Sequence, residues 1–260
     1  MRDFSTQYGP WALVAGASKG LGAAFSEALA KRGLNLVLIA RQRSKLEALA
    51  GALQQNYPIE VRSFSIDLSD PEETRRFLSQ LDVEPGLLVY NAAYSPIGYF
   101  KDISEEDLQK IVAVNVLGPL LLTKALSQKM LAQGRGGIVL MSSLAGSQGS
   151  PKIATYAASK AFNTILAEGL WDELREKGID VIASCAGAIR TPGYQSAKNE
   201  KEAPGTLDPA QVAEKTLQAL GNGPVTVPGR TNQFFRFLMG RLLPRKWAIS
   251  IMKNNTKELS

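Results

Sequence analysis

The chain has 260 residues, of which 45% are hydrophobic, and it contains one cysteine and no histidine. This length is compatible with one large α/β domain, and a single cysteine excludes an internal disulfide and is typical of a reducing cytoplasm. Without histidine, a Ser-His-Asp hydrolase and the usual histidine-ligated metal sites are excluded, and we predict no metal site. The net charge of +6 resides in residues 230–260, which hold seven basic residues and one acidic residue.

Apolar runs and segments of helical periodicity alternate along the chain. The strand-like runs lie at 11–15, 35–40, 60–66, 87–90, 137–142, 180–185 and 224–227. The helical segments lie at 20–32, 42–55, 70–80, 104–131, 156–177 and 208–220. This alternation predicts a single α/β domain with a doubly wound parallel sheet of about seven strands, helices on both faces, and ligands at the carboxyl ends of the strands. The polar N-terminus and the lack of an uninterrupted apolar run of about 18 residues predict neither a signal peptide nor a transmembrane helix.

A glycine-rich turn joins the first predicted strand to the first predicted helix. Its residues are Gly16, Ala17, Ser18, Lys19, Gly20, Leu21 and Gly22. A strand, a turn and a helix in this order present free backbone N–H groups and the positive end of a helix dipole to a phosphate. Glycines are needed where a side chain would block a pyrophosphate or the packing of helix on strand. The turn therefore indicates a dinucleotide site, with an ordinary tight turn as the alternative.

Tyr156 and Lys160 are four residues apart at the start of a helical segment, so they share one face of that helix. A free tyrosine has a pKa of about 10, and a nearby cation stabilises its phenolate, so the pair is suited to proton transfer. The alternative is a surface pair at helical spacing. Ser142 and Ser143 follow an apolar strand, and a serine hydroxyl can donate to a carbonyl oxygen or accept from an alcohol.

Taken together, these motifs resemble the short-chain dehydrogenase/reductase family, and the resemblance runs over about residues 11–227. It rests on the G-x3-G-x-G turn, on Asn115 in the middle helix, on Ser143, and on Tyr156 and Lys160 as a Y-x3-K motif. The resemblance implies a Rossmann-type fold in which Tyr156 transfers the proton, Ser143 orients the substrate oxygen, and Lys160 holds the ribose and tunes Tyr156. For Asn115 it implies a bound water that links Lys160 to solvent; a structural, helix-bending asparagine is the alternative.

The resemblance also implies which residues bind the cofactor. Besides the glycine turn, Tyr156 and Lys160, they are Arg41, Asp67, Leu68, Asn91, Ala92, Ala93, Gly187, Ile189 and Thr191. An NAD-selective enzyme places an acid about 20 residues past the glycines, whereas here Arg41 occupies that region. Arg41 and Lys19 favour the 2′-phosphate of NADP(H), with solvated charges at a helix start as the alternative.

Three positions leave alternatives open. Asp67 resembles the family's adenine contact, but an Asp before a helix could equally be a cap. Ala93 and Ala186 stand where the family usually has glycine and proline, and Ala93 adds a methyl group where backbone normally approaches the cofactor. The long irregular segment 186–207 is implied to be a lid over the substrate.

Residues 230–260 form a basic, amphipathic extension after a predicted catalytic domain of residues 1–229. Pro244 is expected to divide the extension into two short helices. Such a segment can pack onto the fold, wall an apolar pocket, cover a dimer face, or lie as a peripheral contact on an anionic membrane. We expect a homodimer or homotetramer, and we recognise no nucleic-acid motif. Residues expected to face an apolar substrate are Tyr94, Ile97, Tyr99 and Phe100.

The resulting functional prediction is an NADP(H)-dependent oxidoreductase that interconverts a carbonyl and a secondary alcohol. The substrate is expected to be an apolar small molecule of the ketone, steroid or acyl type. One alternative is a sugar-nucleotide epimerase or dehydratase, which shares Y-x3-K but has a differently spaced glycine turn. The other is a non-catalytic NADP-binding interaction protein, and the intact Ser143, Tyr156 and Lys160 argue against it.

Overall fold

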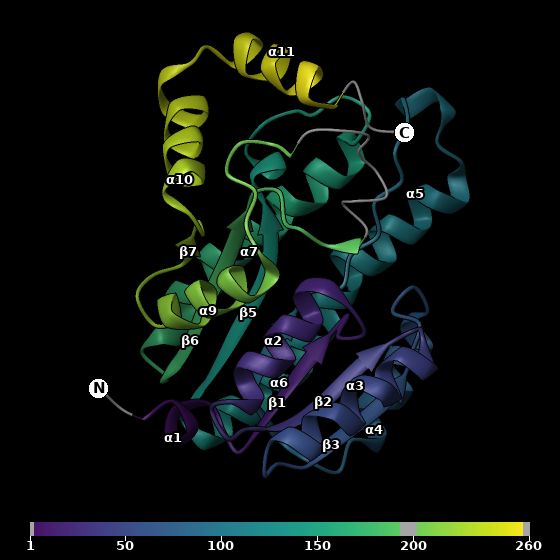
Figure 1. The fold of residues 1–260 in the computed structure, drawn as a ribbon, viewed down its shortest axis with the longest axis vertical. Coiled ribbons are helices and arrows are strands. Elements are labelled where there is room, and N and C mark those ends of the chain that lie inside the picture. The colour runs from purple at the N-terminus through teal and green to yellow at the C-terminus, as the bar shows by residue number, and fades with distance from the viewer. Residues whose placement is uncertain (1–2, 193–201, 257–260) are drawn as a thin grey trace.

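The computed structural model describes residues 3–192 and 202–256, whose strands form one sheet (Figure 1). The strands are β1 (Trp11–Ala15), β2 (Asn35–Ala40), β3 (Val61–Ser65), β4 (Pro85–Tyr90), β5 (Gly136–Ser143), β6 (Ile179–Ala186) and β7 (Val225–Thr226). Their order is β3-β2-β1-β4-β5-β6-β7, and every neighbouring pair is parallel. The predicted Rossmann-type α/β fold with a doubly wound parallel sheet is confirmed.

The helices follow the strands in the predicted order. They are α1 (Phe4–Tyr8), α2 (Gly20–Ala30), α3 (Arg43–Asn56), α4 (Pro71–Gln80), α5 (Glu105–Val112), α6 (Gly118–Gln133), α7 (Ala154–Arg175), α9 (Pro209–Ala219), α10 (Arg230–Phe237) and α11 (Arg245–Thr256). Shorter turns are η1 (Phe100–Asp102), η2 (Ala113–Leu117), η3 (Leu144–Ser147) and η4 (Leu238–Leu242). The sequence prediction omits α1, because five residues are too few to show a helical period.

Helices cover both faces of the sheet (Figure 1). On one face α2 and α9 bury Phe25 and Val212 in the same cluster, together with side chains of α3. On the other face α4 and α6 bury Phe77 and Leu122 in a second cluster, together with side chains of α7. Strands between two helix layers are expected to be apolar at consecutive positions, and β1 and β4 are buried throughout. Because the helices cover the two faces of the sheet, the loops that follow the strands surround the carboxyl ends of the strands.

Residues 105–133 form one long helical segment with a π-helical turn, η2, at its centre. By length and composition alone the segment could cross a membrane. In the fold, however, Leu122, Leu126 and Met130 are fully buried in the core beside the sheet, as in the core helix of a sheet domain. A π-turn adds one residue to a helical turn and is frequent at functional sites. Here it carries Asn115.

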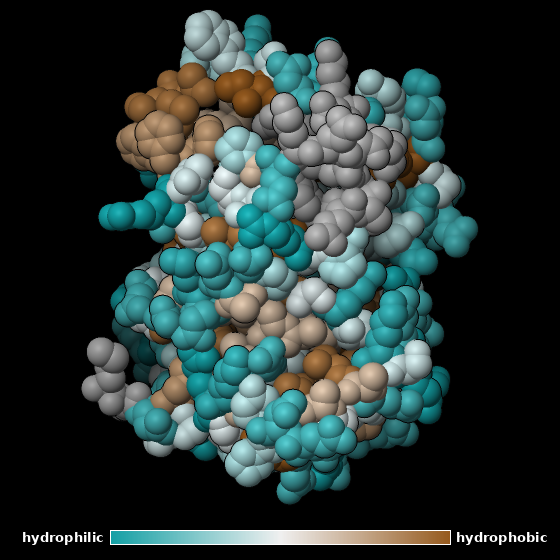
Figure 2. Space-filling view, viewed as in Figure 1, coloured by the Kyte–Doolittle hydropathy of each residue, from teal (hydrophilic) through white to brown (hydrophobic). Residues whose placement is uncertain are grey.

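The C-terminal extension contacts residues of the predicted catalytic domain. The domain boundary at residue 229 stays a prediction. Pro244 lies between η4 and α11, so the predicted division into two helices is confirmed. The Arg245 guanidinium donates to the Ser147 carbonyl oxygen at 2.7 Å, and Ala248 is fully buried. Apolar surface nevertheless remains over α10 and its junction with α11 (Figure 2), where the exposed side chains include Phe234, Phe237, Leu242 and Trp247.

Candidate active site

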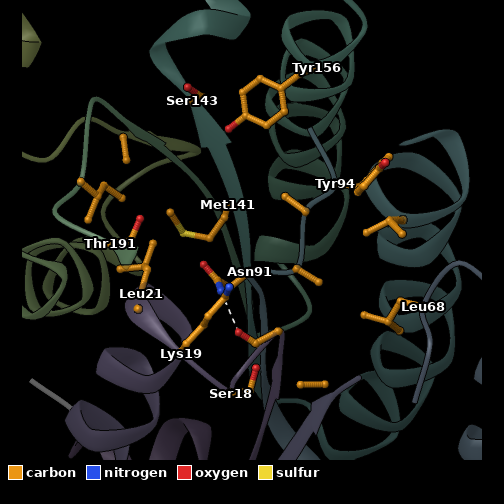
Figure 3. A pocket seen from close by; sticks show the side chains of 18 of the residues that line it. Ser18, Lys19, Leu21, Leu68, Asn91, Tyr94, Met141, Ser143, Tyr156 and Thr191 are labelled. Atoms are coloured by element: carbon orange, nitrogen blue, oxygen red, sulfur yellow. Dashed lines mark hydrogen bonds between the residues drawn. The ribbon is translucent and has the colours of Figure 1, made fainter. Parts of the chain in front are cut away.

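A cavity of about 720 Å³ opens at the carboxyl ends of the central strands (Figure 3). The predicted residues that line it are Gly16, Ser18, Lys19, Gly20, Leu21, Arg41, Asp67, Leu68, Asn91, Ala92, Ala93, Ser143, Tyr156, Lys160, Gly187, Ile189 and Thr191. Gly22 and Asn115 do not line it. Its volume falls within the range of about 300–1,000 Å³ that is typical of small-molecule and cofactor pockets. The predicted residues therefore converge on one cavity, while the role of each stays a prediction.

The glycine turn is folded tightly at one end of this cavity. Gly16 and Gly20 have φ angles of 78° and 56°, a left-handed conformation that glycine adopts without steric cost. A Cβ atom on Gly22 would lie 2.0 Å from the Gly16 carbonyl oxygen, so a side chain there would push α2 away from the turn. The Asn91 side-chain amide donates to the same oxygen at 3.0 Å (Figure 3). Asn91 thereby holds the turn beside the end of β4.

Asn115 lies behind the cavity and is fully buried in η2. Its Oδ1 atom accepts from the backbone N–H of Tyr94 at 2.7 Å. Its Nδ2 atom donates to the Tyr94 carbonyl oxygen at 2.9 Å and to the Ser159 hydroxyl at 3.0 Å. These contacts use both N–H groups of the amide and connect the loop after β4 to α7. They support the structural alternative for Asn115, and the water-holding role stays a prediction.

The two serines at the end of β5 have different surroundings. The Ser142 hydroxyl donates to the Lys160 carbonyl oxygen at 2.7 Å inside the domain. Ser143 points into the cavity beside the Tyr156 hydroxyl (Figure 3), and its Oγ atom accepts from the Ala145 backbone N–H at 3.2 Å. Successive side chains of a strand point to opposite faces. The strand therefore aims Ser143, and not Ser142, at the site of the predicted chemistry.

Tyr156 and Lys160 lie one turn apart on α7. Lys160 is only 2% exposed, and its Nζ atom donates to the Met141 carbonyl oxygen at 2.8 Å. Burial lowers the pKa of Lys160 to about 8, because the ammonium group loses its hydration. Burial also raises the pKa of Tyr156, and a hydrogen bond with the Ser143 side chain opposes that rise. At neutral pH the Tyr156 phenol is therefore protonated and has a proton to donate.

The remaining charges of the cavity are mostly positive. Lys19 and Arg41 line it together with Lys160, whereas Asp67 is the one carboxylate among the described residues that line it. Such an excess of cations attracts an anionic ligand. The turn leads into α2 at Gly20, and the first backbone N–H groups of a helix have no partner within the helix and can bind a phosphate. The residues present therefore fit a phosphate-bearing dinucleotide.

Asp67 is ionised and held in place by its neighbour Ser69. Its Oδ1 atom accepts from the Ser69 backbone N–H at 2.9 Å and from the Ser69 hydroxyl at 2.7 Å. Burial alone would raise the pKa of Asp67, but these hydrogen bonds and the Arg41 charge keep it below its usual value. The cap of α4 is Asp70, which accepts from two backbone N–H groups of the first turn. The alternative that Asp67 is a helix cap is therefore wrong.

After β6 the chain runs along the cavity at residues 187–191. Residues 205–208 come back to contact this stretch, and we call the two stretches together the neck. Ile189 and Leu207 form a parallel β-bridge. The Arg190 guanidinium contacts Glu202 at 2.6 Å and Asp208 at 2.8 Å. These contacts join the two ends of the segment that the family resemblance implies to be a lid. Residues 193–201 of that segment lie outside the described residues.

The neck reaches the glycine turn through Thr191. A Cβ atom on Gly20 would lie 3.0 Å from Thr191 Cγ2, so the two segments approach closely across the cavity. Gly187 and Ile189 line the cavity on the same side. The end of β6 and the glycine turn thus face each other, and the neck sets the distance between them.

An apolar cluster borders Tyr156, with Ala145, Ile153 and Ala157 as its buried members and Ile97 packed against it. Of the residues predicted to face an apolar substrate, Ile97 meets this cluster and Tyr94 lines the cavity, whereas Tyr99 and Phe100 are exposed. The sequence prediction omits several residues that line the cavity: Ala40, Gln42, Ile66, Val114, Met141, Ala188 and Pro192. Most of them are sequence neighbours of predicted site residues at strand ends. Their position beside those residues was the signal that could have found them.

Comparison with known proteins agrees with this arrangement. Residues 10–202 match the family model for the short chain dehydrogenase. The chain belongs to the short-chain dehydrogenase family. It is an oxidoreductase of CH–OH and carbonyl groups, and the family uses NAD(P) cofactors.

Individual relatives of this short-chain dehydrogenase cover most of its length. A very-long-chain 3-oxoacyl-CoA reductase of Podospora anserina is 33% identical over 95% of this chain and 75% of that protein. A structure of a 7beta-hydroxysteroid dehydrogenase superposes with a TM-score of 0.90 at 27% identity, covering 96% of this chain and 99% of that one. A short-chain dehydrogenase from Sphingobium yanoikuyae in complex with NADPH has a TM-score of 0.79 at 30% identity, covering 84% and 87% of the two chains.

Proposed function

We propose that this short-chain dehydrogenase uses NADP(H) to interconvert a carbonyl and a secondary alcohol on an apolar small molecule. The observation that carries the proposal is the arrangement of one cavity. Ser143, Tyr156 and Lys160, the proposed catalytic residues, line the same cavity as Lys19 and Arg41, the proposed phosphate ligands.

In the proposed reaction a bound nicotinamide dinucleotide supplies or accepts the hydride. Ser143 donates a hydrogen bond to the substrate oxygen and holds it beside the Tyr156 hydroxyl. In reduction, Tyr156 transfers its proton from Oη to that oxygen as the alkoxide charge develops. Lys160 stabilises the phenolate that remains, because its ammonium group lies 5.5 Å from the ring centre. In oxidation the same residues move the proton in the opposite direction.

The proposed preference for NADP(H) rests on Arg41. Arg41 follows β2 and lines the cavity, and its charge helps to lower the pKa of Asp67, which lines the same cavity. A guanidinium matches the geometry of a phosphate, so Arg41 is suited to the 2′-phosphate that NAD(H) lacks. Lys19 adds a second cation at the glycine turn.

The proposed substrate class rests on the apolar cluster beside Tyr156 and on the relatives. That cluster offers methyl groups and short apolar side chains to a substrate held at Ser143. One relative is named for a 3-oxoacyl-CoA substrate and another for a hydroxysteroid. We therefore propose a ketone of steroid or acyl type for this chain.

We further propose a cytoplasmic homodimer or homotetramer. The lone cysteine, Cys185, is buried and free among the described residues, which suits a reducing compartment. The exposed apolar side chains of α10 and α11 offer an interface between copies, although contact with a membrane surface is the alternative.

The test is a panel of carbonyl compounds screened by the loss of NADPH absorbance. It should include ketosteroids, 3-oxoacyl thioesters and small polar ketones, each with NADPH and with NADH. We expect turnover of apolar ketones with NADPH and little turnover of the polar ones. Tight NADPH binding with no turnover across the panel would instead favour a non-catalytic binding protein.

A further inference from the structure

Asn232 is a buried polar side chain that the catalytic motifs do not include. It lies in the first turn of α10, beyond the residues that match the family model, and is 2% exposed. Its Nδ2 atom donates to the Gly205 carbonyl oxygen at 3.0 Å and to the Pro228 carbonyl oxygen at 2.9 Å. One amide therefore joins the returning side of the neck to the chain that enters the C-terminal extension.

Glycines surround this amide. A Cβ atom on Gly187 would lie 2.7 Å from Asn232 Oδ1, and one on Gly205 would lie 2.4 Å from the same atom. A Cβ atom on Gly229 would lie 3.3 Å from Asn232 Nδ2. Gly187 and Gly205, which are distant from Asn232 in sequence, therefore approach its side chain so closely that an added Cβ atom at either position would force a shift.

Gly187 connects this contact to the cavity. It directly follows β6 and lines the cavity on one side, while Asn232 packs against it from the other. The neck bridge between Ile189 and Leu207 lies immediately beyond, and Thr191 then meets the glycine turn at Gly20. A change at Asn232 would reach the cavity wall through this chain of contacts.

We propose that Asn232 is a positioning residue for the nicotinamide half of the cofactor. Its amide is fixed by the Gly205 and Pro228 carbonyl oxygens and packs against Gly187, and this keeps residues 187–191 against the cavity. The inference rests on the proposed function only for the identity of the cofactor. The adenosine half should be unaffected, because Arg41, Asp67 and Leu68 follow the strands β2 and β3, whereas the Asn232 amide donates to Gly205 and Pro228.

The experiment measures binding by calorimetry with two probes, NADPH and adenosine 2′,5′-bisphosphate, which contains only the adenosine half. In Asn232→Asp the two N–H donors are replaced by an oxygen, which leaves two buried carbonyl groups without a partner. We expect NADPH binding to weaken about tenfold, equivalent to about 1.4 kcal/mol. Binding of adenosine 2′,5′-bisphosphate should stay within about twofold of the wild type, whereas general damage to the fold would weaken both probes.

A matched control is Gln233→Glu in the next residue of α10. The Gln233 amide also donates to a backbone carbonyl oxygen, that of Val227 at 3.0 Å, but its side chain is exposed. This variant should bind both probes like the wild type.

A second variant disturbs the same contact from the neck and does not depend on the folding of Asn232→Asp. Gly205→Ala places its methyl group against Asn232 and should also weaken NADPH alone. Its control is Gly33→Ala, because Gly33 has a similar positive φ of 74° but no atom within 4 Å of the added Cβ. The proposal is overturned if Gly205→Ala binds NADPH like Gly33→Ala, or if the adenosine probe weakens equally. A wild type that prefers NADH contradicts only the proposed cofactor preference, and NADH and ADP then replace the two probes.

Discussion

Lys160 and Ser143 are positioned by the same strand, β5. The Lys160 ammonium donates to the carbonyl oxygen of Met141 at 2.8 Å, and Ser143 follows Met141 by two residues. Because Tyr156 lies between them, a cation on one side and a hydroxyl on the other act on a single phenol. The geometry of the end of β5 therefore controls all three catalytic candidates.

Tyr156→Phe should abolish turnover while cofactor binding survives. The ring can still pack against the cluster of Ala145, Ile153 and Ala157, but no hydroxyl remains to deliver the proton. General acid–base catalysis typically contributes about 10²–10⁴-fold. Steady-state kinetics and NADPH titration on the same sample measure both quantities. A variant that kept more than about a hundredth of the rate would remove Tyr156 as the acid.

The two serines of β5 should give opposite results. Ser143→Ala should lower kcat by about tenfold or more, because the substrate oxygen loses a donor in the transition state. Ser142→Ala should mainly lower the free energy of unfolding, by about 1 kcal/mol, because it removes a buried hydrogen bond to the Lys160 carbonyl oxygen. Kinetics and urea unfolding of both variants check the assignment. Equal losses of kcat would show that the strand does not separate the two roles.

Arg41→Asp should reverse the cofactor preference from NADPH to NADH. The carboxylate would repel the 2′-phosphate and could accept from the ribose hydroxyl of NADH. Arg43→Asp is the control, because Arg43 is exposed and does not line the cavity. Dissociation constants for both cofactors in the three proteins provide the measurement. Equal affinities for NADPH and NADH in the wild type would contradict the preference at the outset.

Lys160→Met should change how stability depends on pH. The pKa of Lys160 falls from 10.5 to about 8 in the folded cofactor-free protein. Below pH 8 the ammonium is charged in both the folded and the unfolded state. Its lost hydration then lowers the free energy of unfolding. Between about pH 8 and 10.5 the unfolded chain holds more protons, so the wild type should gain up to about 1.4 kcal/mol per pH unit relative to the variant. Urea unfolding at pH 7, 8.5 and 10 tests this, and parallel curves for the two proteins would refute it.

Two helical glycines should respond oppositely to alanine. Gly22→Ala puts a methyl group 2.0 Å from the Gly16 carbonyl oxygen, so it should destabilise the fold and weaken cofactor binding. Gly51→Ala in α3 meets no atom within 4 Å and should stabilise the protein by about 0.5–1 kcal/mol through helix propensity. Thermal melts with and without NADPH compare the pair. Tolerance of Gly22→Ala would mean that α2 can shift away from the turn without loss.

Much of the fold was predictable because each strand is a local apolar run. β1 and β2 have the predicted ends, since β1 is buried along its whole length and β2 at all but its first residue. Each of the other strands differs from the prediction by one or two residues at one end or at both, where pairing with a neighbour extends or shortens the strand. The π-turn at Asn115 lies within a continuous helical pattern, and no local signal separates it from the helices on either side.

The catalytic motifs were predictable for a different reason, since they resemble those of a known family. The resemblance alone selected Ser143 over Ser142, and the strand orientation supplies the physical reason. The cap at Asp70 in place of Asp67 needed the observed helix start. Asn232 could not be predicted at all. Its partner Pro228 is a local neighbour four residues away, but Gly205 is 27 residues away, and only the folded chain brings it and Gly187 to Asn232.

The ion pairs of Arg190 with Glu202 and Asp208 have a consequence for how far the segment after β6 can vary in length. They and the bridge from Ile189 to Leu207 close the segment after β6 at its base. Once these contacts hold the two ends of the segment together, each doubling of the segment's length costs only about 0.6 kcal/mol of chain entropy. Insertions and deletions between residues 192 and 202 should therefore leave the sheet undisturbed. We expect the segment to be exchangeable with that of a relative, and a change of substrate after such an exchange would support the lid that the resemblance implies.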